Sequence, residues 1–224
     1  MTAMADTVAL VRLMTWLSPA FPVGAFSYSG GLEQAVADGD VGDAQTLRGW
    51  LLSLLAHGTL WNDAVLLAAA HRAFDDAERL AEMVALAEAL SGSAERHLET
   101  MLQGGAFLTA AASWPHPVLD ALGDAAAYPV AVGAVSAAHG IGAEAALAAF
   151  LHAVASNLVS VAIRCGVIGQ KNAVSVLAGL EEEIIALAAA AAGSTLDDDL
   201  GSATIRADIA SLRHETLPTR LFRS

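Results

Sequence analysis

Apolar residues recur at every third or fourth position along almost the whole chain, a period that fits helices and little else. Leu10, Leu13 and Leu17, for example, fall on one helical face. No window shows the alternation of apolar and polar residues that is typical of a half-buried strand. Alanine is abundant and β-branched runs are short, so intrinsic propensity favours helix as well. The sequence predicts an all-α fold: a single domain over residues 1–224, built as a bundle of roughly eight to ten helices.

Capping residues and prolines indicate where the helices begin and end. Asp6 or Thr7 is expected to cap the first helix, which ends before Pro19. Asp43 is expected to cap a second helix, which breaks near Gly58 and then resumes. The remaining helices are expected at residues 75–90, 93–113, 130–139, 144–164, 171–192 and 204–213, with a proline-rich break at 114–117.

The chain is acidic, with a formal net charge of -13 and a pI of about 4.7. Binding to nucleic acid requires a basic surface, so we expect no nucleic acid partner. Cys165 is the only cysteine, which excludes an internal disulfide and a cysteine-based zinc site. Because a lone thiol is typical of a reducing compartment, we expect a cytoplasmic protein.

Two long stretches carry no charged residue, Ala125–Ala143 and Ala145–Ile163. Both approach the length that spans a bilayer. They consist mainly of alanine and valine and include polar residues such as Ser136 and Asn157, so we interpret them as helices buried in protein. The start of the sequence shows no basic segment followed by an apolar block. We therefore expect neither a signal peptide nor contact with a membrane.

The local motifs of catalytic and metal sites are missing from the sequence. No two of the seven histidines lie three or four positions apart, so no helix offers a local pair of metal ligands. The glycines before Lys171 lack the spacing of a phosphate-binding loop, and no serine or threonine follows the lysine. Cys165 has no evident histidine partner. We expect no enzyme, no catalytic residue, no metal site and no cofactor; sites assembled across helices or between subunits stay open.

One internal segment, Ser18–Glu33, departs from the helical pattern. Its prolines fix the backbone, its glycines permit close approach, and it holds three aromatic residues between two helices. We expect Phe21 and Phe26 to fill the core. We assign Tyr28 to function, because its hydroxyl offers a polar contact at the end of an apolar ring.

The C-terminal end of the chain has a charge opposite to that of the rest. Residues 193–203 are expected to form an acidic connector, and residues 214–224 a flexible tail that binds a partner. Three arginines stand against one glutamate from Arg213 to Ser224. Leu221 and Phe222 lie between two of those arginines, a mixture that favours a protein interface. The alternative is an end that frays in solution.

Three parts of the sequence resemble one known family, the urease accessory proteins called UreF. Ser18–Glu33 is similar to that family's signature loop. A second group of residues is similar to the family's central block: Tyr128–Gly133, Asn157–Ser160, Arg164 and Gly169–Gln170. His214–Glu215 and Arg220–Ser224 resemble its C-terminal motif. These matches occur in the family's order and span nearly the whole chain.

The resemblance implies an all-helical homodimer that acts as a scaffold in urease maturation. Members of the family are expected to join the accessory protein UreD (also called UreH) and the GTPase UreG on apo-urease (UreABC). There they regulate GTP hydrolysis and support insertion of nickel into the urease active site. The tail is expected to become ordered against UreD. The residues that the resemblance assigns to partner binding are Tyr28, Arg220, Leu221, Phe222, Arg223 and Ser224.

Some positions depart from the family pattern. Leu217-Pro218-Thr219 stands where the family usually has a tyrosine and a serine, and Pro218 both stiffens the tail and removes a donor. Cys165-Gly166-Val167 replaces a leucine-rich, proline-containing approach to Gln170. These departures concern the hydrogen bonds of the tail and the loop around Gln170.

Three polar residues, Asn157, Arg164 and Gln170, allow two interpretations. They can line a polar path for nickel or water, or they can form a structural network that satisfies turn carbonyls, which we favour. Two other function classes also remain. A stand-alone nickel-binding carrier would use several of the histidines, and a helical hydrolase or lyase would need carboxylates that converge in a cavity.

Overall fold

The structure is a computed structural model that describes residues 2–224. Every regular element in this range is a helix, which confirms the all-α prediction. The elements are α1 (Thr2–Trp16), η1 (Ala25–Ser27), α2 (Leu32–Ala37), α3 (Ala44–His57), α4 (Thr59–Arg72), α5 (Ala77–Ala89), α6 (Ala94–Ala111), α7 (Val118–Leu122), α8 (Tyr128–Ala138), α9 (Ala143–Arg164), α10 (Gln170–Ala178), α11 (Glu181–Ala192), α12 (Leu196–Asp199) and α13 (Ile205–His214). There are more helices than the roughly eight to ten predicted from periodicity, because α2, α7 and α12 are too short to give a periodic signal.

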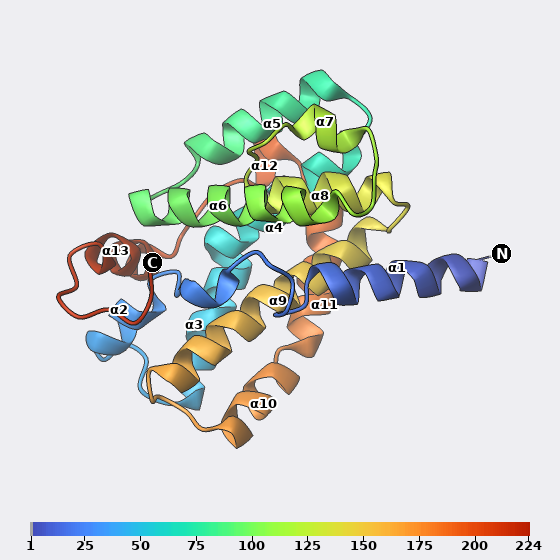
Figure 1. The fold of residues 1–224 in the computed structure, drawn as a ribbon. Helices are drawn as coiled ribbons and strands as arrows, with labels where there is room; N and C mark the ends of the chain where they lie inside the picture. Colours follow the sequence, from blue (N-terminus) through green and yellow to red (C-terminus); the bar gives the residue numbers. More distant parts are fainter. Residues whose placement is uncertain (1) are drawn as a thin grey trace.

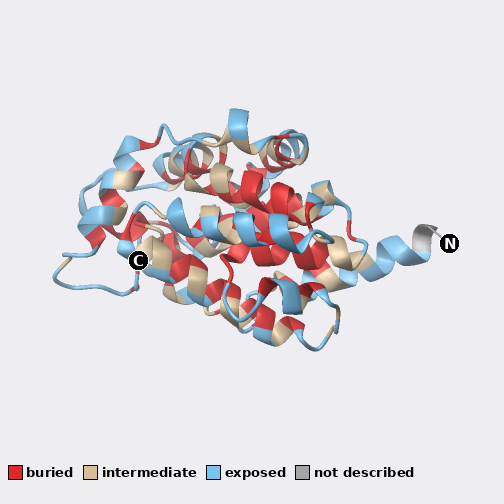
Figure 2. Cartoon of the chain, turned by 90° about the horizontal axis from the view of Figure 1, so that it is seen from above, coloured by how far each residue is buried: buried red, intermediate tan, exposed pale blue. Residues whose placement is uncertain are grey.

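Helix α4 lies at the centre of the fold. It packs against α8, and also against α3, α9 and α11, while α8 packs in turn against α6 (Figure 1). Figure 2 shows that buried residues gather in these central helices, whereas the outer helices expose one face. Ala64–Ala70 of α4 and Tyr128–Ser136 of α8 are buried without interruption. Helices that are apolar all round belong to the interior of a protein, and these two form the middle of the core.

Two glycines let α8 and its surroundings pack closely. A Cβ at Gly133 of α8 would lie 2.3 Å from the carbonyl oxygen of Leu67 in α4. A Cβ at Gly104 of α6 would lie 1.8 Å from the carbonyl oxygen of Ala126, just before α8. Neither distance is physically possible, so any side chain at these positions would push the helices apart.

The helix starts predicted at residues 43, 76 and 93 are confirmed. Asp43 forms a capping box with Thr46, and the hydrogen bond from the Thr46 backbone amide lowers the pKa of the Asp43 carboxyl. Asp76 and Ser93 each accept a hydrogen bond from the backbone amide three residues later. Short-range capping therefore sets the residue at which α3, α5 and α6 each begin.

Two predicted helix boundaries are wrong. The first helix begins at Thr2, before the expected cap at Asp6 or Thr7. The helix predicted at 171–192 divides into α10 and α11 around Gly179 and Leu180. Leu180 is fully buried there, and Arg48 donates to the carbonyl oxygen of Gly179 at 3.0 Å. That carbonyl belongs to a tertiary contact, so packing holds the turn at this point.

The segment 193–203 runs along the start of α4. The indole nitrogen of Trp61 donates to the carbonyl oxygen of Asp199 at 2.8 Å, and the side chain of Asn62 accepts from the amide of Gly201 at 2.9 Å. The amide of Ala203 donates to the carbonyl oxygen of His57 at 2.8 Å. These contacts bring α13 to the side of the bundle where α2 and α6 lie.

Two helical stretches, residues 44–72 and 143–164, have the length and composition of a membrane span. In their most apolar windows, 61% and 50% of the residues are buried inside the fold. Core helices of soluble proteins meet the same criteria, and α4 and α9 both contribute to this core. Burial in protein accounts for the uncharged stretch that becomes α9.

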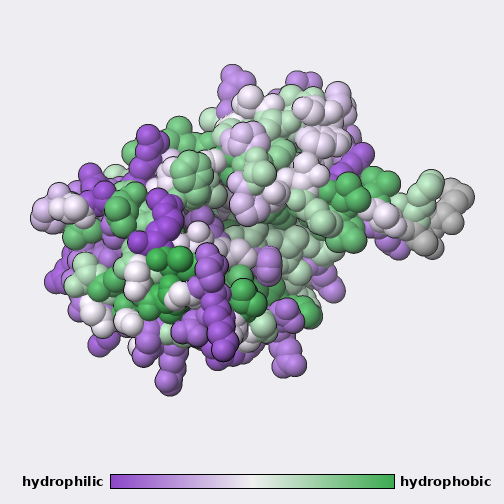
Figure 3. Space-filling model, turned by 60° about the horizontal axis from the view of Figure 1, so that its bottom comes forward, coloured by the Kyte–Doolittle hydropathy of each residue, from purple (hydrophilic) through white to green (hydrophobic). Residues whose placement is uncertain are grey.

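Helix α1 projects from the body on the side away from the C-terminal end (Figure 1). Leu13 and Trp16 near its end are buried, but most of its apolar residues are not. Its exposed apolar residues are Met4, Val8, Leu10, Val11 and Met14. Figure 3 shows hydrophobic side chains on this helix next to the body. An apolar surface of this kind is typical of a protein contact.

Candidate functional site

The segment Ser18–Glu33 connects α1 to α2, and its aromatic residues have different surroundings. Phe21 is buried and lies beside the rings of Phe107 and Trp114. Phe26 is 67% exposed, so the prediction that both phenylalanines fill the core is wrong for Phe26. The turn of η1 presents the backbone carbonyl of Phe26 to the fold, where Arg164 donates to it at 2.5 Å. The ring therefore points away.

Glycine conformations allow this segment to approach α13. Gly30 and Gly31 have φ values of 56° and 80°, in the left-handed region that side chains disfavour. A Cβ on Gly31 would also lie 2.8 Å from the backbone nitrogen of Ser211 in α13. The glycine pair thus brings the signature loop against the last helix.

The tail, residues 214–224, returns to the same loop and ends beside α2 (Figure 1). The amide of Arg223 donates to the carbonyl oxygen of Ser27 at 2.8 Å. The amide of Ser29 donates to the carbonyl oxygen of Ser224 at 2.8 Å, and the Ser29 hydroxyl donates to the same oxygen. The amide of Gly30 donates to the Ser224 hydroxyl at 3.2 Å. In this structure the tail is packed on its own subunit, and its flexibility stays a prediction.

Glu33 of α2 holds the middle of the tail. Its side chain is 10% exposed, and it accepts hydrogen bonds from the amides of Leu221 at 2.7 Å and Phe222 at 3.1 Å. Hydrogen bonds to an ionised acceptor are among the stronger ones in proteins. One carboxylate thus satisfies two consecutive backbone donors of the tail.

Two glutamates of α6 hold residues 220 and 224 of the tail. Glu95 accepts from the guanidinium of Arg220 at 2.5 Å, and Glu99 accepts from the hydroxyl of Ser224 at 3.1 Å. Glu95 and Glu99 are four positions apart, so they share one face of the helix. The tail therefore lies across an acidic face made by α2 and α6.

His214 lies between the glutamates of these two helices. Its ring is completely buried, with Nε2 at 3.0 Å from Oε2 of Glu33 and Nδ1 at 2.7 Å from Oε2 of Glu95. Each of these carboxylates also holds the tail further along the chain. His214 thus joins the two acidic side chains that receive residues 220–222.

Helix α9 contacts the loop and the tail from the other side. Asn157 donates to the carbonyl oxygen of Tyr28 at 3.2 Å. The guanidinium carbon of Arg164 lies 4.1 Å from the ring centre of Phe222, a cation–π geometry. Since Arg164 also donates to the carbonyl oxygen of Phe26, one side chain joins the loop to the tail. These contacts favour the structural interpretation of Asn157 and Arg164.

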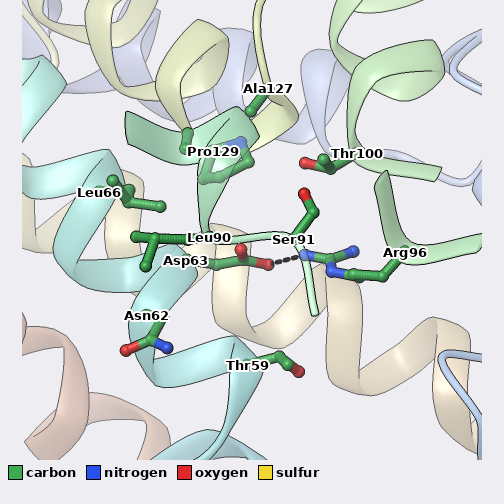
Figure 4. Close-up of a pocket in the computed structure, with 11 residues that line it drawn as sticks. Thr59, Asn62, Asp63, Leu66, Leu90, Ser91, Arg96, Thr100, Ala127 and Pro129 are labelled. Atoms are coloured by element: carbon green, nitrogen blue, oxygen red, sulfur yellow. Dashed lines mark hydrogen bonds and ion pairs between the residues drawn. The ribbon is translucent and has the colours of Figure 1, made fainter. Parts of the chain in front are cut away.

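A buried group of charges lies beneath the tail. Arg96 forms an ion pair with Asp63 of α4 (Figure 4) and a second, at 3.5 Å, with Glu99. Burial raises the pKa of both the Asp63 and the Glu99 carboxyl, and the attraction of Arg96 opposes this effect. Burial alone would lower the pKa of Arg96, but the two carboxylates raise it. Arg96 therefore remains charged and connects α4 to the acidic face of α6.

A cavity of about 310 Å³ opens between the signature loop, α6 and α9. Its polar lining includes Asp63, Arg96, Glu99, Gln103 and Asn157, and its apolar lining includes rings of the signature loop. Glu99 lines this cavity and also binds the tail hydroxyl. The tail and the cavity therefore share one wall.

The predicted site residues have the following positions. Arg164 contacts the tail at Phe222, and Asn157 contacts the loop at Tyr28. Gln170 is exposed at the start of α10, and within residues 2–224 no hydrogen bond links its side chain to these residues. The ring of Tyr28 is buried, and its polar contact is made by the backbone carbonyl. Phe222 and Ser224 are buried in the chain's own fold, while Arg220, Leu221 and Arg223 are exposed. Direct contact of these residues with a partner stays a prediction.

Sequence reasoning missed the acidic residues that receive the tail. Glu33 and His214 fall inside the segments that resemble the family, but their pairing leaves no local signal. Glu95 and Glu99 do leave one: with Gln103 they form a polar stripe at four-residue spacing on a helix that is otherwise half apolar. Such a stripe on a core-facing side indicates a buried polar partner.

These features define an all-helical protein with an apolar projecting helix at one end and a basic tail held on a carboxylate face at the other. Within the described residues, no group of three or more histidine, cysteine, aspartate or glutamate side chains is arranged to hold a metal ion. The exposed apolar residues of α1 and the exposed arginines of the tail are features typical of protein contacts.

Comparison with known proteins places this architecture in a family. The sequence profile of the UreF family matches residues 41–181. The chain is 64% identical to the urease accessory protein UreF of Rhizobium leguminosarum bv. trifolii over 224 residues, covering 100% of both chains. It is 64% identical to UreF of Rhizobium meliloti over 220 residues, 98% of each chain, and 59% identical to that of Agrobacterium fabrum over 224 residues, 100% of each. The chain therefore belongs to the UreF family. The signature loop and the tail lie outside the profile match but inside the full-length alignments.

Proposed function

We propose that this chain is a urease maturation chaperone that joins UreD (UreH) and the GTPase UreG on apo-urease. In this role it regulates GTP hydrolysis and supports nickel insertion without catalysing a reaction itself. The names of its relatives, which describe accessory proteins of urease, support a role in urease maturation. The partners follow from the family resemblance, and a cytoplasmic location follows from the single cysteine.

The observation that carries the proposal is the outer surface of the docked tail. Leu221 is 60% exposed although it lies next to the buried Phe222. The neighbouring arginines, Arg220 and Arg223, are also exposed. On the adjacent helix α13 the exposed apolar residues are Ile205, Ile209 and Leu212. Apolar anchors beside arginines are typical of protein interfaces, and we assign this surface to UreD.

The buried members of the predicted partner site act from beneath in this arrangement. Phe222, Ser224 and Tyr28 hold the tail and the loop in place, so that Leu221 and Arg223 are presented outward. Direct contact of Phe222 with a partner would require the tail to leave its own subunit. We propose that Tyr28 acts on UreG through the position of the loop.

The exposed apolar face of α1 supports a homodimer. Five large apolar side chains on one projecting helix are costly to leave in water, and a second copy of the chain would cover them. Because α1 projects away from the tail, a dimer formed through α1 leaves the tail surface free for UreD.

A nickel path through the subunit would use the cavity lined by Asp63, Glu99 and Asn157, since carboxylate and amide oxygens are ligands for cations. Gln170 does not line it. The alternative function, a stand-alone nickel carrier, would require a ligand cluster, and the described residues offer none. The outward-facing surface of the tail favours the scaffold role over this alternative.

The experiment is co-purification with the UreD homologue. Deleting residues 219–224 should abolish capture of UreD while helical circular dichroism stays nearly unchanged. The deletion also removes the buried Phe222, so the surface variants Leu221→Asp and Arg223→Glu are needed beside it. Both should lose UreD without a change in melting temperature. The matched control is Ile185→Asp, at a residue of α11 that is 64% exposed. Full retention of UreD by the deletion variant would contradict the proposal.

A further inference from the structure

The surroundings of His214 require a specific protonation state. An ionised carboxylate can only accept hydrogen bonds. Both ring nitrogens of His214 face carboxylate oxygens, Nε2 that of Glu33 and Nδ1 that of Glu95. Both nitrogens must therefore carry a proton for both contacts to be attractive. The two contacts therefore fit an imidazolium at His214.

The charges around the ring balance only in that state. Glu33 faces it from α2 and Glu95 from α6, and Arg220 of the tail is bound to the far oxygen of Glu95. At the end of α9, burial raises the pKa of the Cys165 thiol, and the nearby charge of Glu33 raises it further. Glu99 is one turn further along α6, where it pairs with Arg96. The neighbouring Arg213 is turned to Asp38. Two carboxylates thus face two cations, His214 and Arg220.

Loss of one proton from the ring would disturb a carboxylate that holds the tail. A neutral imidazole has one N–H group. If the proton stays on Nδ1, the lone pair of Nε2 faces Glu33 at 3.0 Å, and Glu33 holds the amides of Leu221 and Phe222. If it stays on Nε2, the lone pair of Nδ1 faces Glu95, which holds Arg220. Either tautomer leaves an unbalanced buried charge next to the tail.

We propose that His214, Glu33 and Glu95 form a protonation-dependent latch for the tail. The imidazolium keeps residues 220–224 docked on α2 and α6, and loss of one proton releases them. A released tail exposes Phe222 and frees the backbone donors of residues 221 and 222. The consequence for partner binding rests on the proposed function: a docked tail presents Leu221 and Arg223, and a released tail also presents Phe222.

The test measures the tail in the full-length chain without any partner, so its outcome is independent of the urease role. Nuclear magnetic resonance reports the ring protonation of His214 and the exchange protection of the amides of Leu221 and Phe222. Protection factors correct for the intrinsic pH dependence of exchange. As the pH is raised, protection of both amides should fall about tenfold or more, in step with loss of the ring proton. Protection that stays constant while the ring titrates would overturn the proposal.

Two variants and a control sharpen the test. His214→Gln cannot balance two carboxylates, so both amides should exchange at the fast, high-pH rate throughout. Glu95→Gln offers an amide that can donate to a neutral ring, so docking should persist after the ring loses its proton. Because Glu95→Gln keeps His214, it remains informative if His214→Gln does not fold. The control is His57→Gln, an exposed position on α3 that should behave as the wild type. A Glu95→Gln tail released at the same pH as the wild type would count against the latch.

Discussion

His214 and Glu33 are separated by 181 positions in the sequence, yet Nε2 of His214 lies 3.0 Å from Oε2 of Glu33. Glu33 ends the signature loop and His214 begins the C-terminal tail. Two segments that the sequence presents as separate features are therefore parts of one site. The same carboxylate also accepts from the amides of Leu221 and Phe222, so the ring of His214 and two backbone donors of the tail share one acceptor group.

Replacing Glu33 should destabilise the fold. Glu33→Ala leaves the two tail amides and the His214 ring without their acceptor in a buried place, at a cost of about 2 kcal/mol. Urea denaturation followed by circular dichroism measures this loss. Glu182→Ala, at an exposed position of α11, is the matched control and should stay within about 0.5 kcal/mol of the wild type. Equal stability of the two variants would show that the contacts of Glu33 contribute nothing to the fold.

Replacing Arg164 should lower stability before it affects partner binding. Arg164→Met keeps an apolar stem over Phe222 but removes the cation–π contact and the hydrogen bond to the carbonyl oxygen of Phe26. The expected loss is about 1 to 2 kcal/mol, measured as a lower melting temperature. Arg79→Met on the exposed side of α5 is the control. If Arg164→Met lost UreD at an unchanged melting temperature, Arg164 would contact the partner itself.

The helix pair α4 and α8 should not tolerate a methyl group at its contact. Gly133→Ala would place a carbon 2.3 Å from the carbonyl oxygen of Leu67, so the backbones must separate, at a cost of about 1 to 3 kcal/mol. Gly49→Ala is the matched control: Gly49 lies inside α3, and a Cβ there meets no atom within 4 Å. That change should be neutral or stabilising by up to about 1 kcal/mol, since alanine is the better helix former. Thermal denaturation measures the melting temperature of both variants, which should fall for Gly133→Ala alone.

Glu99 should make stability depend on pH. Burial raises the pKa of the Glu99 carboxyl. A carboxyl with a raised pKa in the folded state stabilises the fold when protonated, and this contribution is lost as pH rises through that folded pKa. Glu99→Gln is neutral at every pH, so its stability relative to the wild type should increase as the pH rises through the pKa of the folded Glu99 carboxyl.

Urea midpoints at two pH values measure the effect of Glu99→Gln. Glu182→Gln on α11 is the control, because the Glu182 side chain is exposed. A difference between Glu99→Gln and the wild type that stays constant with pH would mean that Glu99 is as easily ionised in the fold as in the unfolded chain. In that case the attraction of Arg96 would outweigh the effect of burial.

Local signals predicted the elements of the fold but not the way in which they meet. Asp43, Asp76 and Ser93 marked helix starts because a cap acts within three residues. The division of residues 171–192 was missed because Arg48, from a different helix, binds the carbonyl oxygen of Gly179. The exposure of Phe26 was missed because Arg164 binds its backbone. Each error involves a contact between residues far apart in the sequence.

Periodicity, capping and motifs are properties of neighbouring residues, so the all-α class, most helix boundaries and the resemblance to the UreF family could be predicted without the structure. The tertiary structure alone decided which charges meet: Arg96 with Asp63, and His214 with Glu33 and Glu95. It also decided that Phe222 lies inside the fold while Leu221 lies outside. The physical reason is that a buried charge is tolerated only beside its partner, and the packing of helices brings that partner from a distant part of the chain.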